Sequence, residues 1–197
     1  MPRIAAANIE EHIRNQDQRI LDAARDRFVE LGYRGSDMAG IAESMGLARN
    51  SLYRYYSSKD HIRVAVIKRD MAPFFDQIDD LEDRIADPVG RIDAWIGLQM
   101  EIAAGPCHEM MRMLGEIPAS SRELRREISA LHEPPKRALQ NAVDEVLEGS
   151  GRDTRLITAM ISSMVQSAAV VALQMNSSDA CIEELRRSIR RILTTGG

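Results

Sequence analysis

Apolar residues recur at intervals of three and four along most of the chain, which is the spacing that buries one face of an α-helix. The first clear run predicts a helix from about Asp17 to Leu31, and Gly32 lies where a C′ glycine ends a helix. The residues before Asp17 are expected to form a frayed, solvated terminus. The inward positions of this helix are Ile20, Leu21, Ala24, Phe28 and Leu31.

Three further helices are predicted before residue 80. Ser36 and Asp37 are candidate N-caps for the first of them, and Gly46 breaks the chain after it. Ser57 or Ser58 caps the last and longest. We expect these helices to cover about 38–45, 49–56 and 59–77.

The remainder of the chain predicts a larger helical bundle. Asp87-Pro88 opens a helix whose inward positions are Ile92, Trp95, Ile96, Gln99 and Met100. Further helices are expected between Gly105-Pro106 and Pro118, and over 120–130, 134–148, 154–175 and 179–193, with a loop at 149–153. Because no alternating β-pattern is found, the predicted fold class is all-α, with about nine helices.

Charge is distributed unevenly along the chain, whose net charge is −4. Residues 1–70 carry 12 Lys and Arg against 10 Asp and Glu, a net of +2, whereas the remainder carries 14 against 20, a net of −6. Local positive charge is expected when a small head contacts a polyanion and the body does not.

The sequence predicts a cytoplasmic protein with no membrane partner. The N-terminus lacks the apolar core of a secretion signal, and the run Ala159–Met175 is short and rich in Ser and Gln for a spanning helix. Cys107 and Cys181 are the two cysteines, which imply no disulfide framework.

The stretch from Gly46 to Asp60 combines aromatic and basic residues. Three of the four tyrosines lie here, interleaved with basic residues: Tyr53, Tyr55 and Tyr56 with Arg49, Arg54 and Lys59. A buried core favours the rings but not the arginines, and a solvated face favours the arginines but not the rings. The combination favours a surface that lies along a phosphate backbone.

Two short helices joined at Gly46 form a candidate helix-turn-helix, whose second helix can enter a major groove. The residues from Ile20 to Ile62 resemble the DNA-binding domain of the TetR family of transcriptional regulators. The matching pieces are Ile20-Leu21, Ala23-Ala24, Phe28, Gly32-Tyr33, Ile41-Ala42, Gly46-Leu47, Leu52 to Tyr56 and Ser58 to Asp60. The resemblance implies a DNA-binding domain over 1–58, with its motif at about 37–56, and a helical effector-binding and dimerisation domain over 59–197.

The resemblance also implies which residues contact DNA. Tyr53, Tyr55 and Lys59 are expected at phosphates. Arg49, Asn50 and Arg54 point outward, where Arg can bind guanine and Asn can read adenine. The alternative is that both arginines contact phosphate alone.

Two positions depart from the family pattern. Ala48 stands where Ser or Thr usually opens the recognition helix, so Ser51 is expected to carry more of the backbone contact. Asp37 replaces a common Thr or Ser near the DNA and is expected to act as an N-cap.

The last two predicted helices have the pattern of a helix–helix seam. Ile182, Leu185, Ile189 and Ile192 repeat at spacings of 3, 4 and 3. The resemblance implies that helices 154–175 and 179–193 pair with their copies in a homodimer, and the alternative is an edge of an intramolecular bundle. The preceding helix is expected to add Ile161, Met164, Ala168 and Val171, while the arginines at 186, 187, 190 and 191 stay in solvent.

An effector pocket is implied by the resemblance, and methionine could adapt its shape to an apolar ligand. The alternative is that the candidate lining residues are ordinary core residues of the bundle. The candidate lining residues are Trp95, Gln99, Met100, Met110, Met111, Met113, Met160 and Met164.

No catalytic or metal-binding motif is found, so we expect neither an enzyme nor a cofactor. Cys107-His108-Glu109 is read as a free thiol with incidental neighbours, because adjacent helical residues diverge by about a hundred degrees. The sequence thus predicts a regulator of this family: a homodimeric repressor, released from a near-palindromic operator in double-stranded DNA by a small, apolar effector. The alternatives are a DNA-binding dimer without an effector, and a ligand carrier or enzyme with a vestigial head.

Overall fold

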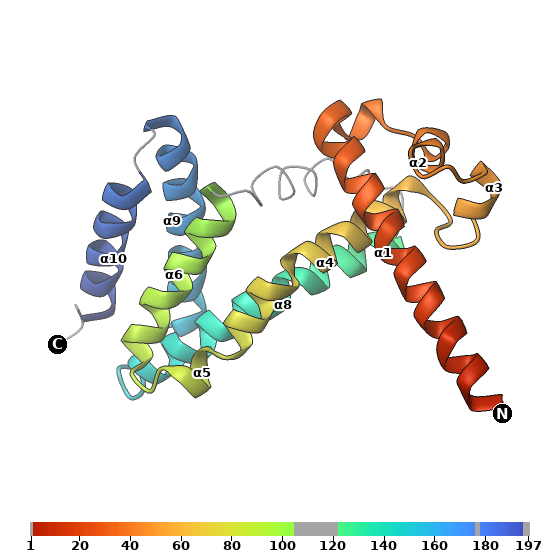
Figure 1. Cartoon of the computed structure of the whole chain (residues 1–197). Coiled ribbons are helices and arrows are strands. Elements are labelled where there is room, and N and C mark those ends of the chain that lie inside the picture. Colours follow the sequence, from red (N-terminus) through yellow and green to blue (C-terminus); the bar gives the residue numbers. More distant parts are fainter. Residues whose placement is uncertain (1, 105–121, 176–177, 195–197) are drawn as a thin grey trace. The chain divides into compact units, whose positions relative to one another are not determined.

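The computed structural model of the chain describes residues 2–104, 122–175 and 178–194, and the secondary structure within these ranges is helical. The elements are α1 (Pro2–Gly35), α2 (Met38–Ser44), α3 (Arg49–Leu52), α4 (Lys59–Asp79), α5 (Leu81–Arg84), α6 (Pro88–Ala104), α8 (Arg122–Val146), α9 (Thr154–Met175) and α10 (Ser178–Thr194) (Figure 1). The predicted all-α class is confirmed. The short helix predicted between Gly105-Pro106 and Pro118 lies outside the described residues.

The chain divides into two compact units, here called the head and the body. The head is Met1–Asp70 with Met113–Glu127, and the body is Met71–Arg112 with Ile128–Gly197. Helices α4 and α8 each contribute to both units. The boundary expected between residues 58 and 59 lies at the start of α4, within the head, and the assignment of one function to each domain stays a prediction.

Each of the first four helices buries an apolar face in the head. The buried residues are Ile20, Leu21, Ala24 and Phe28 of α1, Met38, Ile41 and Ala42 of α2, Leu52 of α3, and Ile62, Val64, Val66 and Ile67 of α4. Leu31 was expected among them but is 45% exposed. The Tyr33 ring packs against Phe28 instead, with ring centroids 5.8 Å apart.

Helix α1 is longer than the sequence predicted. It begins at Pro2, so the expectation of a frayed terminus before Asp17 is wrong for the backbone of these residues. Gly32, at φ 71° and ψ 165°, interrupts the helix where its end was predicted. This conformation is almost confined to glycine, so the sequence signal for the break was local.

The body is built around α6, α9 and α10, which contact one another (Figure 1). Ile92, Trp95, Ile96 and Met100 are buried, as predicted for the inward face of α6. Three residues of α8 complete this core, namely Leu139, Ala142 and Val143.

Helix α8 joins two helices that the sequence separated at Pro134-Pro135. It runs without interruption from Arg122 to Val146, with both prolines inside it. Two prolines remove two backbone donors from the ladder, which is why a break was expected there. The Trp95 indole N–H donates to the carbonyl of Pro135 at 2.8 Å, so α6 contacts the helix at this point.

Helix α9 is 22 residues long, and its most apolar 18-residue window has a mean hydropathy of 1.9, enough by length and composition to cross a membrane. The sequence argument that this run is too short is therefore wrong. A third of its most apolar window (33%) is buried in the body, and a core helix of a folded domain passes the same test. The remaining apolar side chains of α9 need another explanation.

Replacing Gly32 by Ala should lower the free energy of unfolding by about 1–3 kcal/mol, because its backbone region is strained for any residue with a Cβ. Gly35→Ala is the matched control, since its added Cβ would lie 3.4 Å from the Leu31 Cβ in ordinary contact. That variant should change stability by less than about 0.5 kcal/mol. Urea denaturation of both measures the difference, and equal losses would contradict the expectation.

Candidate DNA-binding site

The helix-turn-helix begins at the carboxylate of Asp37. Its Oδ1 accepts a hydrogen bond from the Gly40 N–H at 2.7 Å and caps α2, as predicted. Ser36 does not share this role, because its hydroxyl donates to the carbonyls of Arg27 and Gly32 at 3.0 and 2.8 Å. The carboxylate is thus engaged at a helix N-terminus, where negative charge is favourable, and its contact with DNA stays a prediction.

The turn between α2 and α3 is formed at Gly46, whose φ is 69°. The Leu47 N–H donates to the Ala42 carbonyl at 2.8 Å, which holds the turn against α2. Helix α3 then starts after Ala48, which makes no side-chain capping bond. The helix ends at Leu52 rather than at residue 56, because the amides of residues 54 and 55 bond three residues back and tighten the chain.

Five of the predicted DNA-contacting residues are exposed on α3 and the turn that follows it, namely Arg49, Asn50, Tyr53, Arg54 and Tyr55. Arg49 Nη2 donates to the Tyr53 hydroxyl at 3.1 Å, and its guanidinium lies 5.5 Å from the centroid of that ring. Ser51 is half-buried. The structure therefore leaves these five side chains accessible to a ligand outside the head.

Leu52 and Tyr56 face the opposite way. Leu52 is fully buried, and the half-buried Tyr56 donates from its hydroxyl to Asp17 Oδ1 at 2.7 Å. Burial, and then the hydrogen bond, raise the pKa of Tyr56 above its usual value. Leu52 and Tyr56 therefore belong to the core of the head rather than to its outer surface.

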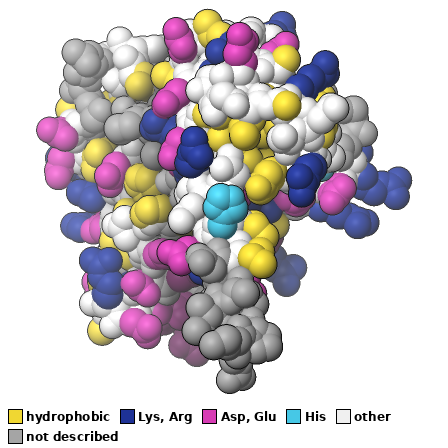
Figure 2. Space-filling view, turned by 45° about the vertical axis from the view of Figure 1, so that its right-hand side comes forward, with side chains coloured by type: hydrophobic (Ala, Val, Ile, Leu, Met, Phe, Trp, Pro, Cys, Tyr) yellow, Lys and Arg dark blue, Asp and Glu magenta, His cyan; other side chains and the backbone are white. Residues whose placement is uncertain are grey.

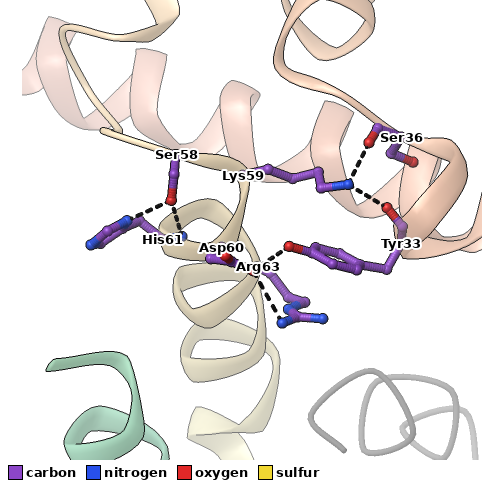
Figure 3. A network of polar contacts seen from close by, with 7 residues as sticks. All are labelled: Tyr33, Ser36, Ser58, Lys59, Asp60, His61 and Arg63. Carbon is purple, nitrogen blue, oxygen red and sulfur yellow. Dashed lines mark hydrogen bonds and ion pairs between the residues drawn. The ribbon is translucent and has the colours of Figure 1, made fainter. Parts of the chain in front are cut away.

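Lys59 opens α4 and binds the backbone at the end of α1 (Figure 3). Its Nζ donates to the carbonyls of Tyr33 and Ser36 at 2.7 and 2.6 Å, and burial lowers the pKa of this ammonium. The cap of α4 is Ser58, whose Oγ accepts from the His61 N–H at 3.4 Å. A third ammonium hydrogen remains for a phosphate, so the predicted contact of Lys59 with DNA stays a prediction.

The Tyr33 ring forms the centre of a polar network (Figure 3). Its hydroxyl donates to the Asp60 carboxylate, and the Arg63 guanidinium lies 3.6 Å from the ring centroid. Arg63 is fully buried and donates to Asp60 Oδ1 at 3.2 Å. Sequence reasoning counted Arg63 only as local positive charge, although its spacing of three from Asp60 on an apolar helix was a signal for this pair.

Charge on the surface is mixed. Figure 2 shows Lys and Arg side chains interleaved with Asp and Glu, with hydrophobic side chains between them.

The pocket residues predicted from the sequence are only partly brought together. A cavity of about 1120 Å³ lies between α6, α8 and α9, and Trp95 and Gln99 line it. Met100 is buried in the core, Met160 is 48% exposed, and Met164 borders a different groove. The described methionines therefore do not line this cavity, and Met110, Met111 and Met113 lie outside the described residues, as does Cys107-His108-Glu109.

Three residues predicted at the dimer interface belong to the core of their own chain. Ile161, Leu185 and Ile189 are 0%, 6% and 1% exposed. These side chains pack in the core cluster of the body, and Leu185 also lines the groove between α9 and α10. Their contact with a second copy stays a prediction. Of the four arginines expected in solvent, Arg186 is half-buried and donates to the Asp93 carbonyl. Arg190 is exposed, as expected, and donates to the Asp93 carboxylate.

The other predicted interface residues lie nearer the surface. Met164, Ala168 and Val171 line a groove of about 470 Å³ between α9 and α10. Ile182 and Ile192 are half-buried against the body core. Their contact with a second copy stays a prediction.

In the head, the capped helix α2 is followed by the turn at Gly46 and then by the exposed basic helix α3. This order defines the class of helix-turn-helix DNA-binding regulators. Residues 20–66 match the family described as bacterial regulatory proteins, tetR family. The head therefore contains the DNA-binding domain of this family, as the resemblance implied for these residues.

Relatives extend the similarity beyond the head. The chain is 24% identical over 181 residues to the fatty acid metabolism regulator protein of Bacillus subtilis (strain 168), covering 90% of this chain and 93% of that protein. It is 28% identical over 116 residues to the HTH-type transcriptional regulator RutR of Escherichia coli (strain K12), covering 57% and 54%.

The fold is also similar to that of solved regulators. The crystal structure of FadR from Bacillus subtilis in complex with stearoyl-CoA matches with a TM-score of 0.69 at 24% identity, covering 91% of this chain and 98% of that one. The fatty acid degradation regulator FadR from Bacillus halodurans matches with a TM-score of 0.67 at 19% identity, covering 91% and 95%.

Removing the hydroxyls of Tyr33 and Tyr56 together, by substitution with Phe, should destabilise the protein at neutral pH by about 1–3 kcal/mol, because each donates to a carboxylate. Burial raises the pKa of both hydroxyls. Their contribution is therefore complete below the pKa of an unfolded tyrosine, about 10, and is lost as pH rises through the higher folded pKa.

Urea denaturation at neutral pH and at stepwise higher pH measures this dependence. The double variant should show a smaller alkaline loss of stability than the wild-type protein. Tyr55→Phe is the control, because Tyr55 is 37% exposed and its hydroxyl bonds to no other residue that the structure describes. Parallel alkaline curves for the double variant and the wild-type protein would contradict the assignment.

Proposed function

We propose that this protein is a homodimeric transcriptional repressor that binds a near-palindromic operator through α3 and leaves it when a small molecule occupies the body. The observation that carries the proposal is the exposure of Arg49, Asn50, Tyr53, Arg54 and Tyr55 on one short helix and its following turn. The family match over residues 20–66 supports it.

The exposed side chains have the chemistry of groove recognition. The guanidiniums of Arg49 and Arg54 can each donate two hydrogen bonds to guanine, and the Asn50 amide can pair with adenine. Tyr53 and Tyr55 can donate their hydroxyls to phosphates, which position the helix without reading sequence. The Arg49–Tyr53 bond holds a candidate base-reading residue beside a candidate phosphate-binding residue.

The network around Tyr33 supports the proposal that a conformational change in the body is transmitted to the head. It attaches the first turn of α4, through Lys59, Asp60 and Arg63, to the segment between α1 and α2. Helix α4 continues to Asp79, in residues that belong to the body. A shift of α4 would therefore move the head, and an effector acts if it binds one of two such arrangements more tightly.

A second copy of the chain is the proposed cover for the exposed apolar side of α9. Val170, Val171, Leu173 and Met175 are between 41% and 67% exposed in the single chain. Beside them, Met164 and Ala168 line the groove against α10. A two-fold dimer through this face would give two heads for two half-sites.

The effector is proposed to bind the body cavity. One regulator of similar fold was crystallised with stearoyl-CoA, and a relative is named for fatty acid metabolism, so acyl compounds are a first class to test. The relatives are regulators, and we propose that this chain likewise has no enzymatic activity and acts in the cytoplasm, where its DNA would be.

Arg49→Ala should weaken binding to the operator by about 1–3 kcal/mol and relax the preference at one base pair. The operator is found by selecting bound fragments from random DNA with the full-length protein. Arg84→Ala, at an exposed arginine of α5, is the control and should bind like the wild-type protein. Unchanged affinity and preference in Arg49→Ala would remove α3 as the reading helix.

Val171→Glu should raise the dimer dissociation constant at least about a hundredfold, because a buried unpaired carboxylate costs several kcal/mol. Val29→Glu, at a 61% exposed position of α1, is the matched control and should leave the dimer intact. Sedimentation equilibrium measures both, with circular dichroism to confirm folding. A folded Val171→Glu variant that stays dimeric would place the interface elsewhere.

A further inference from the structure

Two polar side chains of the body cavity lack hydrogen-bond partners. Among the residues that the structure describes, Gln99 Nε2 and Thr158 Oγ1 are buried atoms with no partner, and both residues line the cavity. Thr158 is only 3% exposed. A buried polar atom without a partner costs stability and is rare in folded proteins, so these two groups need an explanation.

Two cations at the same cavity are also unpaired. Lys136 of α8 and Arg155 of α9 are exposed lining residues, and neither has an ion pair or hydrogen bond with another described residue. Asp144 is the single acid among the described lining residues, and its Oδ1 already accepts from Gln140 Nε2 at 2.8 Å. The cavity thus offers free donors and, with two cations against one carboxylate, an excess of positive charge.

The cavity lining also has a small apolar part, which includes Trp95 and Val165. The Trp95 indole N–H is occupied by the Pro135 carbonyl at 2.8 Å, so its ring presents only apolar surface. Val165, on the same side of α9 as Thr158, is also a lining residue and is 4% exposed. An apolar group of a ligand can therefore lie beside the unpaired donors.

We propose that the cavity binds an organic anion, a molecule with an apolar body and an oxyanion head. The head accepts hydrogen bonds from Gln99 and Thr158, the charges of Lys136 and Arg155 attract it, and the body packs on Trp95 and Val165. A carboxylate or a phosphate monoester would supply this chemistry. The inference rests on the proposed effector response, but it replaces the purely apolar ligand expected from the sequence.

The single tryptophan of the chain reports binding without DNA. Hexanoate, decanoate, phenylacetate and hexyl phosphate are titrated into the full-length protein while Trp95 fluorescence is followed. Each carboxylate is tested beside its neutral primary amide, and hexyl phosphate beside hexanol. At least one anion should give a saturable change, and its neutral counterpart should bind about tenfold more weakly or worse, because hydrogen bonds to a charged acceptor are the stronger ones. The phosphate arm separates the two sources of the oxyanion.

Variants test whether the unpaired groups hold the ligand. Thr158→Val and Gln99→Met each keep the side-chain size and should weaken binding of the anion about tenfold or more, with no loss of melting temperature in the free protein, because no bond is lost. Thr194→Val, on α10 outside the cavity lining, is the matched control and should bind like the wild-type protein.

The outcomes separate this inference from the proposed function. Equal binding of the anions and their neutral counterparts, no binding of any anion, or unchanged binding by both variants would overturn the organic-anion assignment, even if stearoyl-CoA releases the protein from its operator. Binding of an anion that leaves the operator complex intact would instead support the ligand class and contradict the proposed effector response. A lower melting temperature of free Thr158→Val would show that its hydroxyl is already satisfied, which removes the premise.

Discussion

The arrangement of the head depends on a ring of tyrosine held between charged groups. The Tyr33 hydroxyl binds Asp60, its ring lies within 4.0 Å of both the Lys59 ammonium and the Arg63 guanidinium, and its carbonyl accepts from Lys59. A fully buried arginine is costly unless it is paired and hydrogen-bonded, so this network is stable only as a unit. It fixes the first turn of α4 against the segment that leads into the DNA-reading motif.

Helix α9 carries apolar residues on two surfaces, one buried in the core of its own chain and one exposed. Its own core takes Ile157, Ile161, Val165, Ala169 and Ala172, which lie at helical spacing on one side. Apolar residues continue round the helix, and those on the other sides stay exposed or line the groove with α10. A helix that is apolar beyond the needs of its own core is expected to lie against another surface, and a second copy of the chain is the proposed one.

The body cavity differs in character from the core that surrounds it. The core packs aliphatic side chains closely, whereas the cavity is lined by amides, hydroxyls and charges, with Thr158 and Gln99 unsatisfied. In the proposed complex the oxyanion head satisfies both groups, and these hydrogen bonds supply binding energy and selectivity between ligands.

The sequence by itself determined the all-α class, the break at Gly32, the cap at Asp37 and the exposed residues of α3, because these follow from local backbone chemistry and from a motif of fixed spacing. Only the tertiary structure decided which face of α9 is core, since apolar residues continue round that helix, and what the apolar face of α10 packs against. The tertiary structure alone also decided the roles of the methionines, Arg63 and Thr158. Their roles depend on partners far away in the chain, which no local pattern specifies.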